Sequence, residues 1–198
     1  MRLMVVGTSG AGKSTFASEF AKRSGCAHIE LDEINWQPGW RDLQTHDPEE
    51  FKRRTAKAAA MEAWVCDGNY TIVRPYVLPR ATHLVWLDYS RPVIMRRVIW
   101  RSISRAISRR ELYNGNREEA RQWLGTDHPI RWAWDTFHRR RAEYETLLAT
   151  PHCAHLKVFR LGRPWEASEA MALLTGTGFA KTGTRFAKRQ PKSPESSA

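Results

Sequence analysis

A glycine-rich segment near the start of the chain limits the possible folds more than any other feature. Residues 7–14 read Gly-Thr-Ser-Gly-Ala-Gly-Lys-Ser and match the phosphate-binding pattern G-x-x-x-x-G-K-[ST]. The apolar run of residues 3–6 predicts a buried parallel strand before this loop, and residues 14–24 predict a helix after it. In that setting, backbone N–H groups and a helix N-terminus point toward a bound anion. The competing interpretation is an ordinary glycine-rich turn between a strand and a helix.

The loop predicts a site for a nucleoside triphosphate together with Mg²⁺. Lys13 would place a positive charge near the β- and γ-phosphates, and Ser14 would offer its hydroxyl to the metal. The residues expected to bind the nucleotide are Gly7, Ser9, Gly10, Ala11, Gly12, Lys13, Ser14 and Thr15. ATP and Mg²⁺ are therefore the expected cofactors.

Apolar runs alternate with helical patterns along the rest of the chain. Strands are expected at 2–6, 27–31, 63–66, 83–87 and 156–160, and helices at 14–24, 48–61, 91–110, 128–149 and 164–174. This order predicts an α/β P-loop fold, a five-stranded parallel sheet with helices on both faces. We expect one domain at 1–178, a lid-like segment at about 102–127 within it, and a basic, disordered tail at 179–198.

The composition indicates a cytoplasmic protein with anionic partners. The 198 residues carry a formal net charge of +11, which suits polyphosphates or nucleic acid and does not choose between them. Cys26, Cys66 and Cys153 show no disulfide or zinc spacing, so reduced thiols are expected. No apolar run is long enough to cross a membrane, and the early first strand leaves no room for a signal peptide.

Two acidic residues follow predicted strands. In an open parallel sheet, ligands bind at the carboxyl ends of the strands. Asp32 would hold Mg²⁺ through water or accept a proton from an acceptor hydroxyl, and the alternative is a helix cap or turn. Asp88 ends the run Leu84–Leu87 in the manner of a metal-binding strand end, and a capping role is at least as well supported.

Arginines and tryptophans supply further candidates. Arg97, Arg101 and Arg105 share one helix face and could donate to phosphates, although a solvated face would show the same spacing. Trp36 and Trp40 could form a stacking wall for a ring, or simply pack their own loop. Trp132 and Trp134 are expected in the core or against another helix, and the seven histidines are expected to be structural.

Several of these segments resemble P-loop kinases of the nucleoside monophosphate kinase type. Leu87-Asp88-Tyr89-Ser90-Arg91-Pro92 leads to Arg97 and Arg101 at the offset of the R-x-x-x-R pair that grips ATP phosphates in adenylate kinases. The resemblance implies the same catalytic role for Arg97 and Arg101, beside Lys13 and Asp32. Asp67-Gly68-Asn69-Tyr70-Thr71 is similar to the D-G-F-P-R-T segment of those kinases, but Tyr70 stands near the place of the arginine that holds the acceptor's phosphate.

A closer resemblance is to the adenylate-kinase-like proteins called topology modulation proteins. Shared segments are L-D-x-x-x-W-x-P-G-W, D-G-N-Y and W-x-W, and the likeness spans residues 1–165. Residues expected on the acceptor side are Trp36, Trp40, Asp67, Asn69 and Arg131. The sequence thus predicts a phosphotransferase that moves the γ-phosphoryl of ATP to a small acceptor other than a nucleoside monophosphate. The alternative is a nucleotide-dependent regulator that binds nucleic acid.

Overall fold

A central parallel sheet organises the molecule. The computed structural model describes residues 1–108, 113–116 and 129–176. The sheet has the order β2-β5-β1-β6-β7, and every neighbouring pair in it is parallel. Its strands are β1 (Arg2–Gly7), β2 (Ala27–Glu30), β5 (Trp64–Asp67), β6 (His83–Leu87) and β7 (Lys157–Leu161). The five strands predicted from the apolar runs are confirmed.

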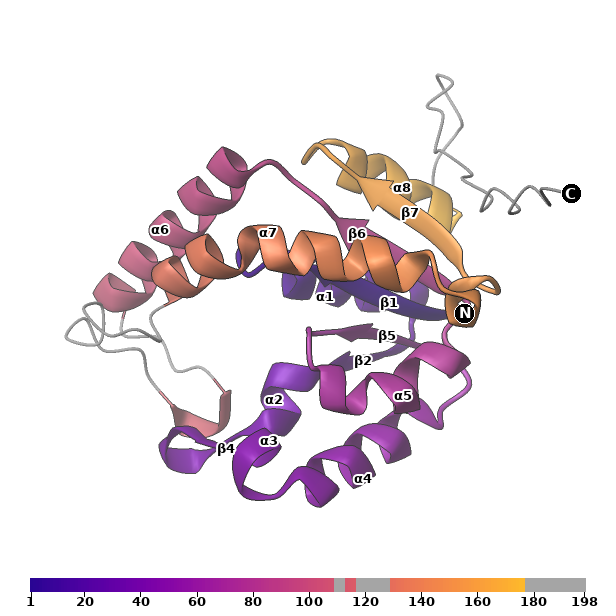
Figure 1. The fold of residues 1–198 in the computed structure, drawn as a ribbon, viewed down its shortest axis with the longest axis horizontal. Helices are drawn as coiled ribbons and strands as arrows, with labels where there is room; N and C mark the ends of the chain where they lie inside the picture. The colour runs from indigo at the N-terminus through magenta and orange to yellow at the C-terminus, as the bar shows by residue number, and fades with distance from the viewer. Residues whose placement is uncertain (109–112, 117–128, 177–198) are drawn as a thin grey trace, which may run out of the picture.

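Helices cover the sheet and extend beyond it (Figure 1). The helices are α1 (Lys13–Ser24), α2 (Leu31–Asn35), α3 (Leu43–His46), α4 (Pro48–Ala59), α5 (Arg74–Val77), α6 (Arg91–Ser108), α7 (Pro129–Leu148) and α8 (Glu166–Thr175). A small hairpin, β3 (Trp36–Gln37) with β4 (Arg41–Asp42), lies apart from the sheet. The sequence patterns did not predict α2, α3, α5 or this hairpin.

Successive side chains of each strand point to opposite faces of the sheet, so a hydrophobic core forms on each face. Leu3 and Val5 face the core shared with α1, α6 and α8. Met4 and Val6 face the second core, with α4 and α5. Helix α7 contributes to both, because Phe137 lies in the first core and Tyr144 in the second.

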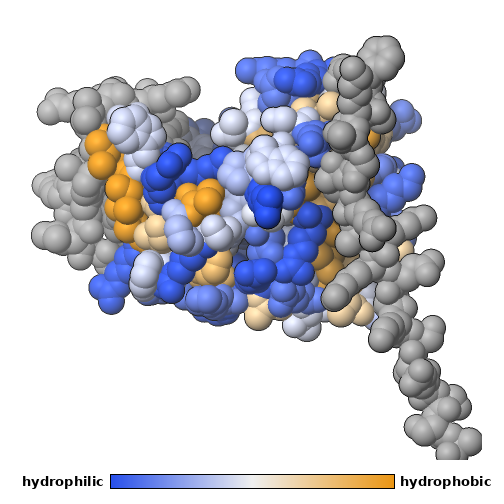
Figure 2. Space-filling view, turned by 90° about the horizontal axis from the view of Figure 1, so that it is seen from above, coloured by the Kyte–Doolittle hydropathy of each residue, from blue (hydrophilic) through white to orange (hydrophobic). Residues whose placement is uncertain are grey.

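The surface is polar, with scattered apolar side chains. Figure 2 shows a mainly hydrophilic face on which hydrophobic residues form small patches. Trp132 and Trp134 do not lie in the core, since they are 45% and 52% exposed. Trp134 instead packs against Arg91 of α6, whose guanidinium carbon lies 3.3 Å from the centroid of its ring. Ala133, which lies between the two tryptophans in the sequence, faces the core instead. Among the described residues, no helix is long and apolar enough to cross a membrane.

Two predicted segments fall largely outside the described residues. Of the lid-like segment 102–127, the structure describes 102–108, which continue α6, and 113–116. The tail at 179–198 lies entirely outside the described part of the chain.

Candidate active site

The glycine-rich loop between β1 and α1 presents an open helix N-terminus. Gly12 caps α1 in the left-handed region, with φ 96°, and no side chain caps this helix. The first turn of α1 also lacks an acidic residue. The backbone N–H groups of this turn are therefore available to an anion, which the helix dipole would attract.

Helix α6 packs directly on the loop. Gly10 has φ +85°, and a Cβ atom there would lie 2.2 Å from Cγ2 of Val98. Only glycine allows this close approach. Arg97, one residue before Val98, donates to the carbonyl oxygen of Ala11 at 2.9 Å, and Arg101 donates to Oγ of Ser9 at 3.3 Å. Both arginines predicted from the R-x-x-x-R spacing thus reach the loop.

Ser14 is linked to a buried carboxylate. Its Oγ donates to Oδ2 of Asp67 at 2.6 Å, and Asp67 is 2% exposed. The other oxygen of Asp67 lies 2.8 Å from Nε2 of His28. Burial by itself lowers the pKa of His28, but the hydrogen bond and charge of Asp67, with Glu30 and Glu33, raise it overall.

This pair of oxygens fits a magnesium ion. Mg²⁺ prefers hard oxygen ligands, and it uses few protein groups when substrate phosphates supply others. Ser14 and Asp67 offer a hydroxyl and a carboxylate at the edge of the loop. Among the described residues, no group of three or more His, Cys, Asp or Glu side chains could hold a metal by itself. The donor set therefore suits Mg²⁺ bound together with phosphates.

Charged side chains converge on Lys13. Burial is the largest influence on its pKa and lowers it, while Asp32 and Asp67 act in the opposite direction. Arg101 and Arg140 add to the lowering through like-charge repulsion. The Lys13 ammonium donates to the carbonyl oxygen of Thr8 at 3.4 Å. Charged residues of α2, β5, α6 and α7 thus act electrostatically on this one lysine.

The segment 67–70 contacts the loop and Asp32 through three side chains. Asp67 holds Ser14, and Asn69 donates to the carbonyl oxygen of Gly7 at 2.7 Å. Tyr70 donates to Oδ1 of Asp32 at 2.6 Å. The backbone at Gly68 packs closely on Leu31. A Cβ atom at Gly68 would lie only 2.7 Å from the Cβ of Leu31, so a glycine is needed there.

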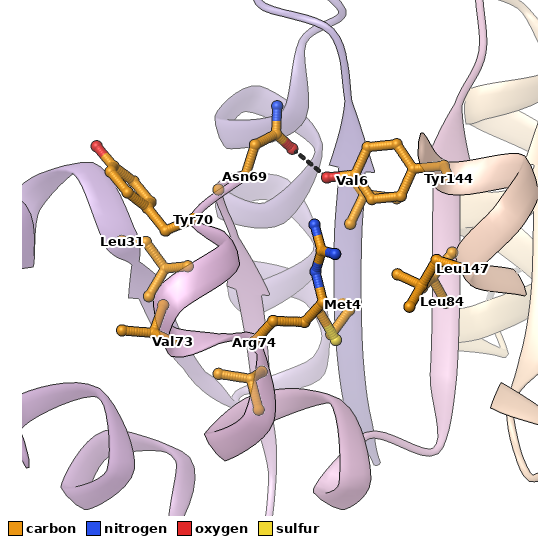
Figure 3. Close-up of a pocket in the computed structure, with 12 residues that line it drawn as sticks. Met4, Val6, Leu31, Asn69, Tyr70, Val73, Arg74, Leu84, Tyr144 and Leu147 are labelled. Carbon is orange, nitrogen blue, oxygen red and sulfur yellow. Dashed lines mark hydrogen bonds between the residues drawn. The ribbon is translucent and has the colours of Figure 1, made fainter. Parts of the chain in front are cut away.

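A small apolar pocket opens beside this segment (Figure 3). Met4, Val6 and Leu84 form part of its wall from the sheet. Tyr144 of α7 closes one side and donates to Oδ1 of Asn69 at 2.7 Å. Arg74 points into the space between Asn69 and Tyr144 in the close-up.

Two arginines share one carboxylate next to the pocket. Arg74 and Arg140 both donate to Glu143. Their side chains are only 15% and 17% exposed. Two guanidinium groups and one carboxylate leave a net positive charge, and Arg140 also acts on Lys13. This pair can accept a further anionic group.

The remaining predicted residues take varied positions. Trp36 and Trp40 pack edge to face, with ring centroids 5.4 Å apart. Arg131 faces Asp135 one turn along α7 and is exposed, and Thr15 is exposed on α1. Asp88 is 6% exposed and binds Arg160, so it serves an ion-pair network.

Sequence reasoning missed four residues of this site. His28, expected to be structural, contacts Asp67, and Arg140, Glu143 and Tyr144 were not considered. His28 and Glu30 alternate along β2 just before Asp32, and this period of two was a usable signal. Nothing in the sequence marks which residues of the long helix α7 face the loop.

Comparison with solved structures shows a shared fold. Shikimate kinase from Bacteroides thetaiotaomicron superposes with a TM-score of 0.55 and 17% identity, over 89% of this chain and 97% of that one. Shikimate kinase from Acinetobacter baumannii, in complex with shikimate, superposes with a TM-score of 0.53 and 18% identity, over 88% of this chain and 93% of that one. Shikimate kinase from Aquifex aeolicus superposes with a TM-score of 0.51 and 14% identity, over 89% of this chain and 97% of that one.

The chain has the α/β fold of these P-loop kinases. This confirms the predicted five-stranded parallel sheet with helices on both faces. No protein-family model matches the sequence, and no curated protein matches it. The nucleic-acid alternative finds no support in these comparisons.

Proposed function

We propose that this protein is an ATP- and Mg²⁺-dependent phosphotransferase acting on a small, hydroxyl-bearing acceptor. The observation that carries the proposal is the contact between Ser14 and the buried Asp67, within an otherwise complete phosphate-binding loop. A glycine-rich turn without a ligand would not need a buried carboxylate at this position. The likeness to topology modulation proteins rests on the sequence motifs.

The charges around the loop suit phosphoryl transfer, in which positioning and electrostatics provide most of the catalysis. The loop amides and Lys13 would hold the phosphates, and Arg97 and Arg101 would neutralise charge that develops on the transferred group. Ser14 and Asp67 would hold Mg²⁺, which would offset the negative charge of the phosphates. The arginines already touch the loop, so little movement is needed.

Asp32 would act on the acceptor. It follows β2 and acts electrostatically on Lys13. In the proposed reaction the acceptor oxygen bonds to the γ-phosphorus, the bond to the β-phosphate oxygen breaks, and the hydroxyl proton passes to Asp32. ADP and a phosphorylated acceptor result.

The acceptor side favours a compact anion. Arg74 and Arg140 would receive a carboxylate at the edge of the apolar pocket. Arg80 does not join this pair, because it donates to the carbonyl oxygens of Ala59 and Ala60 at the end of α4. The solved A. baumannii structure contains shikimate, a compound of this chemical kind.

A panel of acceptors tests the proposal. ADP formation is measured with Mg²⁺·ATP and, separately, nucleoside monophosphates, neutral sugars and ring-bearing hydroxy acids such as shikimate. We expect the hydroxy acids to give the largest stimulation and AMP to give little. Turnover of AMP at roughly 1–100 s⁻¹, the usual kinase range, would contradict the assignment of the acceptor.

A further inference from the structure

The carboxylate of Asp32 is held from one side. Its Oδ1 accepts the hydrogen bond from Tyr70 at 2.6 Å. Within residues 1–108, 113–116 and 129–176, no hydrogen bond to Oδ2 is found. One oxygen of Asp32 is thus fixed by a neighbour, and the other is left for a different partner.

Tyr70 is itself rigidly placed. Its ring packs edge to face on Phe51 of α4, with centroids 5.1 Å apart at 85°, and Phe51 is fully buried. The neighbouring Gly68 passes too close to Leu31 for any other residue. The donor to Asp32 therefore has a defined position between α4 and α2.

The Tyr70 hydroxyl keeps its proton throughout the neutral range. Burial raises the pKa of Tyr70 far above its usual value, and the negative charge of Asp32 raises it further. The hydroxyl consequently acts as a donor to Asp32 and does not compete with it for a proton.

We propose that Tyr70 is a positioning residue that holds Asp32 by Oδ1, so that Oδ2 is the oxygen that meets the acceptor hydroxyl. The proposal rests on the proposed function. A carboxylate on a short side chain can rotate about two bonds, and a misplaced base costs rate even when the substrate still binds. Tyr70 removes that freedom, and it touches neither the loop nor Lys13 in any contact of the described residues.

The test compares Tyr70→Phe, Asp32→Asn and the double variant, with Tyr76→Phe as the matched control. Tyr76 is exposed and lies outside the site, and its substitution removes the same atom. ADP release from Mg²⁺·ATP is measured with water as the acceptor, beside ATP affinity by calorimetry and a melting curve.

We expect Tyr70→Phe to slow ADP release about tenfold, while ATP affinity changes less than about twofold. The double variant should be no slower than Asp32→Asn alone, because Tyr70 acts through Asp32. A Tyr70→Phe rate equal to that of Tyr76→Phe would overturn the proposal. So would losses that multiply in the double variant, which would place the action of Tyr70 elsewhere.

Two further measurements separate the possible failures. If wild-type ADP release exceeds that of Lys13→Ala neither with water nor with any acceptor of the panel, the proposed function itself fails. A crystal structure of the wild-type protein with ADP and Mg²⁺ tests the contact without any variant. Retention of the hydrogen bond between Tyr70 and Asp32 supports the proposal, and its loss overturns it even if transfer is active.

Discussion

Lys13 combines a buried ammonium with nearby charges of both signs. Asp32 and Asp67 favour its charged form, and Arg101 and Arg140 oppose it. Bound phosphates would add negative charge at this point and relieve the repulsion among the three cations. The residue is therefore expected to matter for ligand binding more than for folding.

Lys13→Ala should weaken ATP binding by roughly 1.5–3 kcal/mol, the usual loss for a hydrogen bond to a charged group. The melting temperature should stay close to that of the wild type, since desolvation of the ammonium is also removed. Calorimetric titration with Mg²⁺·ATP measures the first quantity. Unchanged affinity would show that the loop does not hold phosphates.

Arg97 and Arg101 should act on the transition state more than on bound ATP. Replacing either with Ala is expected to raise the barrier by about 2–4 kcal/mol, as with other donors to developing charge. Arg96→Ala is the control, because Arg96 is exposed on the same helix. Single-turnover rates of phosphoryl transfer give the comparison. Equal rates for all three variants would show that Arg97 and Arg101 do not act on the transition state.

At the scale of elements, residues 113–116 connect two distant parts of the chain. Asn116 accepts from the backbone N–H of Trp40 and donates to the carbonyl oxygen of Gln37, both at 2.9 Å. Asn114 donates to the carbonyl oxygen of Trp36 at 2.6 Å. Figure 1 shows this short stretch beside the β3–β4 hairpin. The hairpin of Trp36 and Trp40 is thus held by residues far along the sequence.

Asn116→Ala should loosen the β3–β4 hairpin locally. The substitution leaves the N–H of Trp40 and the carbonyl of Gln37 without this partner, at a cost of about 1–3 kcal/mol. Hydrogen exchange followed by mass spectrometry should show faster exchange in residues 36–42 and unchanged exchange in β1. Identical exchange in both proteins would mean that the contact carries no stability.

Glu143 ties α5 to α7 and gives stability a dependence on pH. Burial by itself raises its pKa, but hydrogen bonds and charges from Arg74 and Arg140 hold the pKa below 4.5. A depressed carboxyl pKa stabilises the fold above the unfolded value, about 4.5, and this contribution is lost as the pH falls through the folded pKa.

Glu143→Gln should therefore lower the melting temperature at pH 7 by about 2–4 °C, as expected for a loss near 1 kcal/mol. The difference from the wild type should shrink as the pH falls below 4.5. Glu62→Gln, at an exposed position, is the control and should show no such trend. A difference that stays constant down to pH 3 would contradict the assigned ion pairs.

At the scale of the whole molecule, strand order decides which acid meets the loop. The apolar runs were enough to predict the five strands and the long helices. They could not show that β5 lies next to β1, which brings Asp67 to Ser14. Asp88 directly follows β6, which also lies beside β1, but Arg160 of β7 donates to its carboxylate. The metal role predicted for Asp32 stays a prediction, because Tyr70 is its observed partner.

Contacts across large sequence distances explain what else was missed. The segment 31–42 has no periodic pattern, and its shape depends on Asn114 and Asn116. Arg140 and Glu143 lie on a helix rich in charged residues, where spacing alone does not mark the face toward the loop. Local patterns therefore predicted the framework and the loop, whereas the acceptor side required the tertiary structure.

Transfer of label from ATP to an organic acceptor tests the central claim most directly. The protein is incubated with Mg²⁺ and ATP labelled in the γ-phosphoryl group, together with the panel of hydroxy acids, and products are separated by mass. The account predicts label on a hydroxyl oxygen of one acceptor in amounts equal to ADP, dependent on Mg²⁺ and abolished in Lys13→Ala. Label found only in inorganic phosphate, or only in ATP that remains bound, would contradict it.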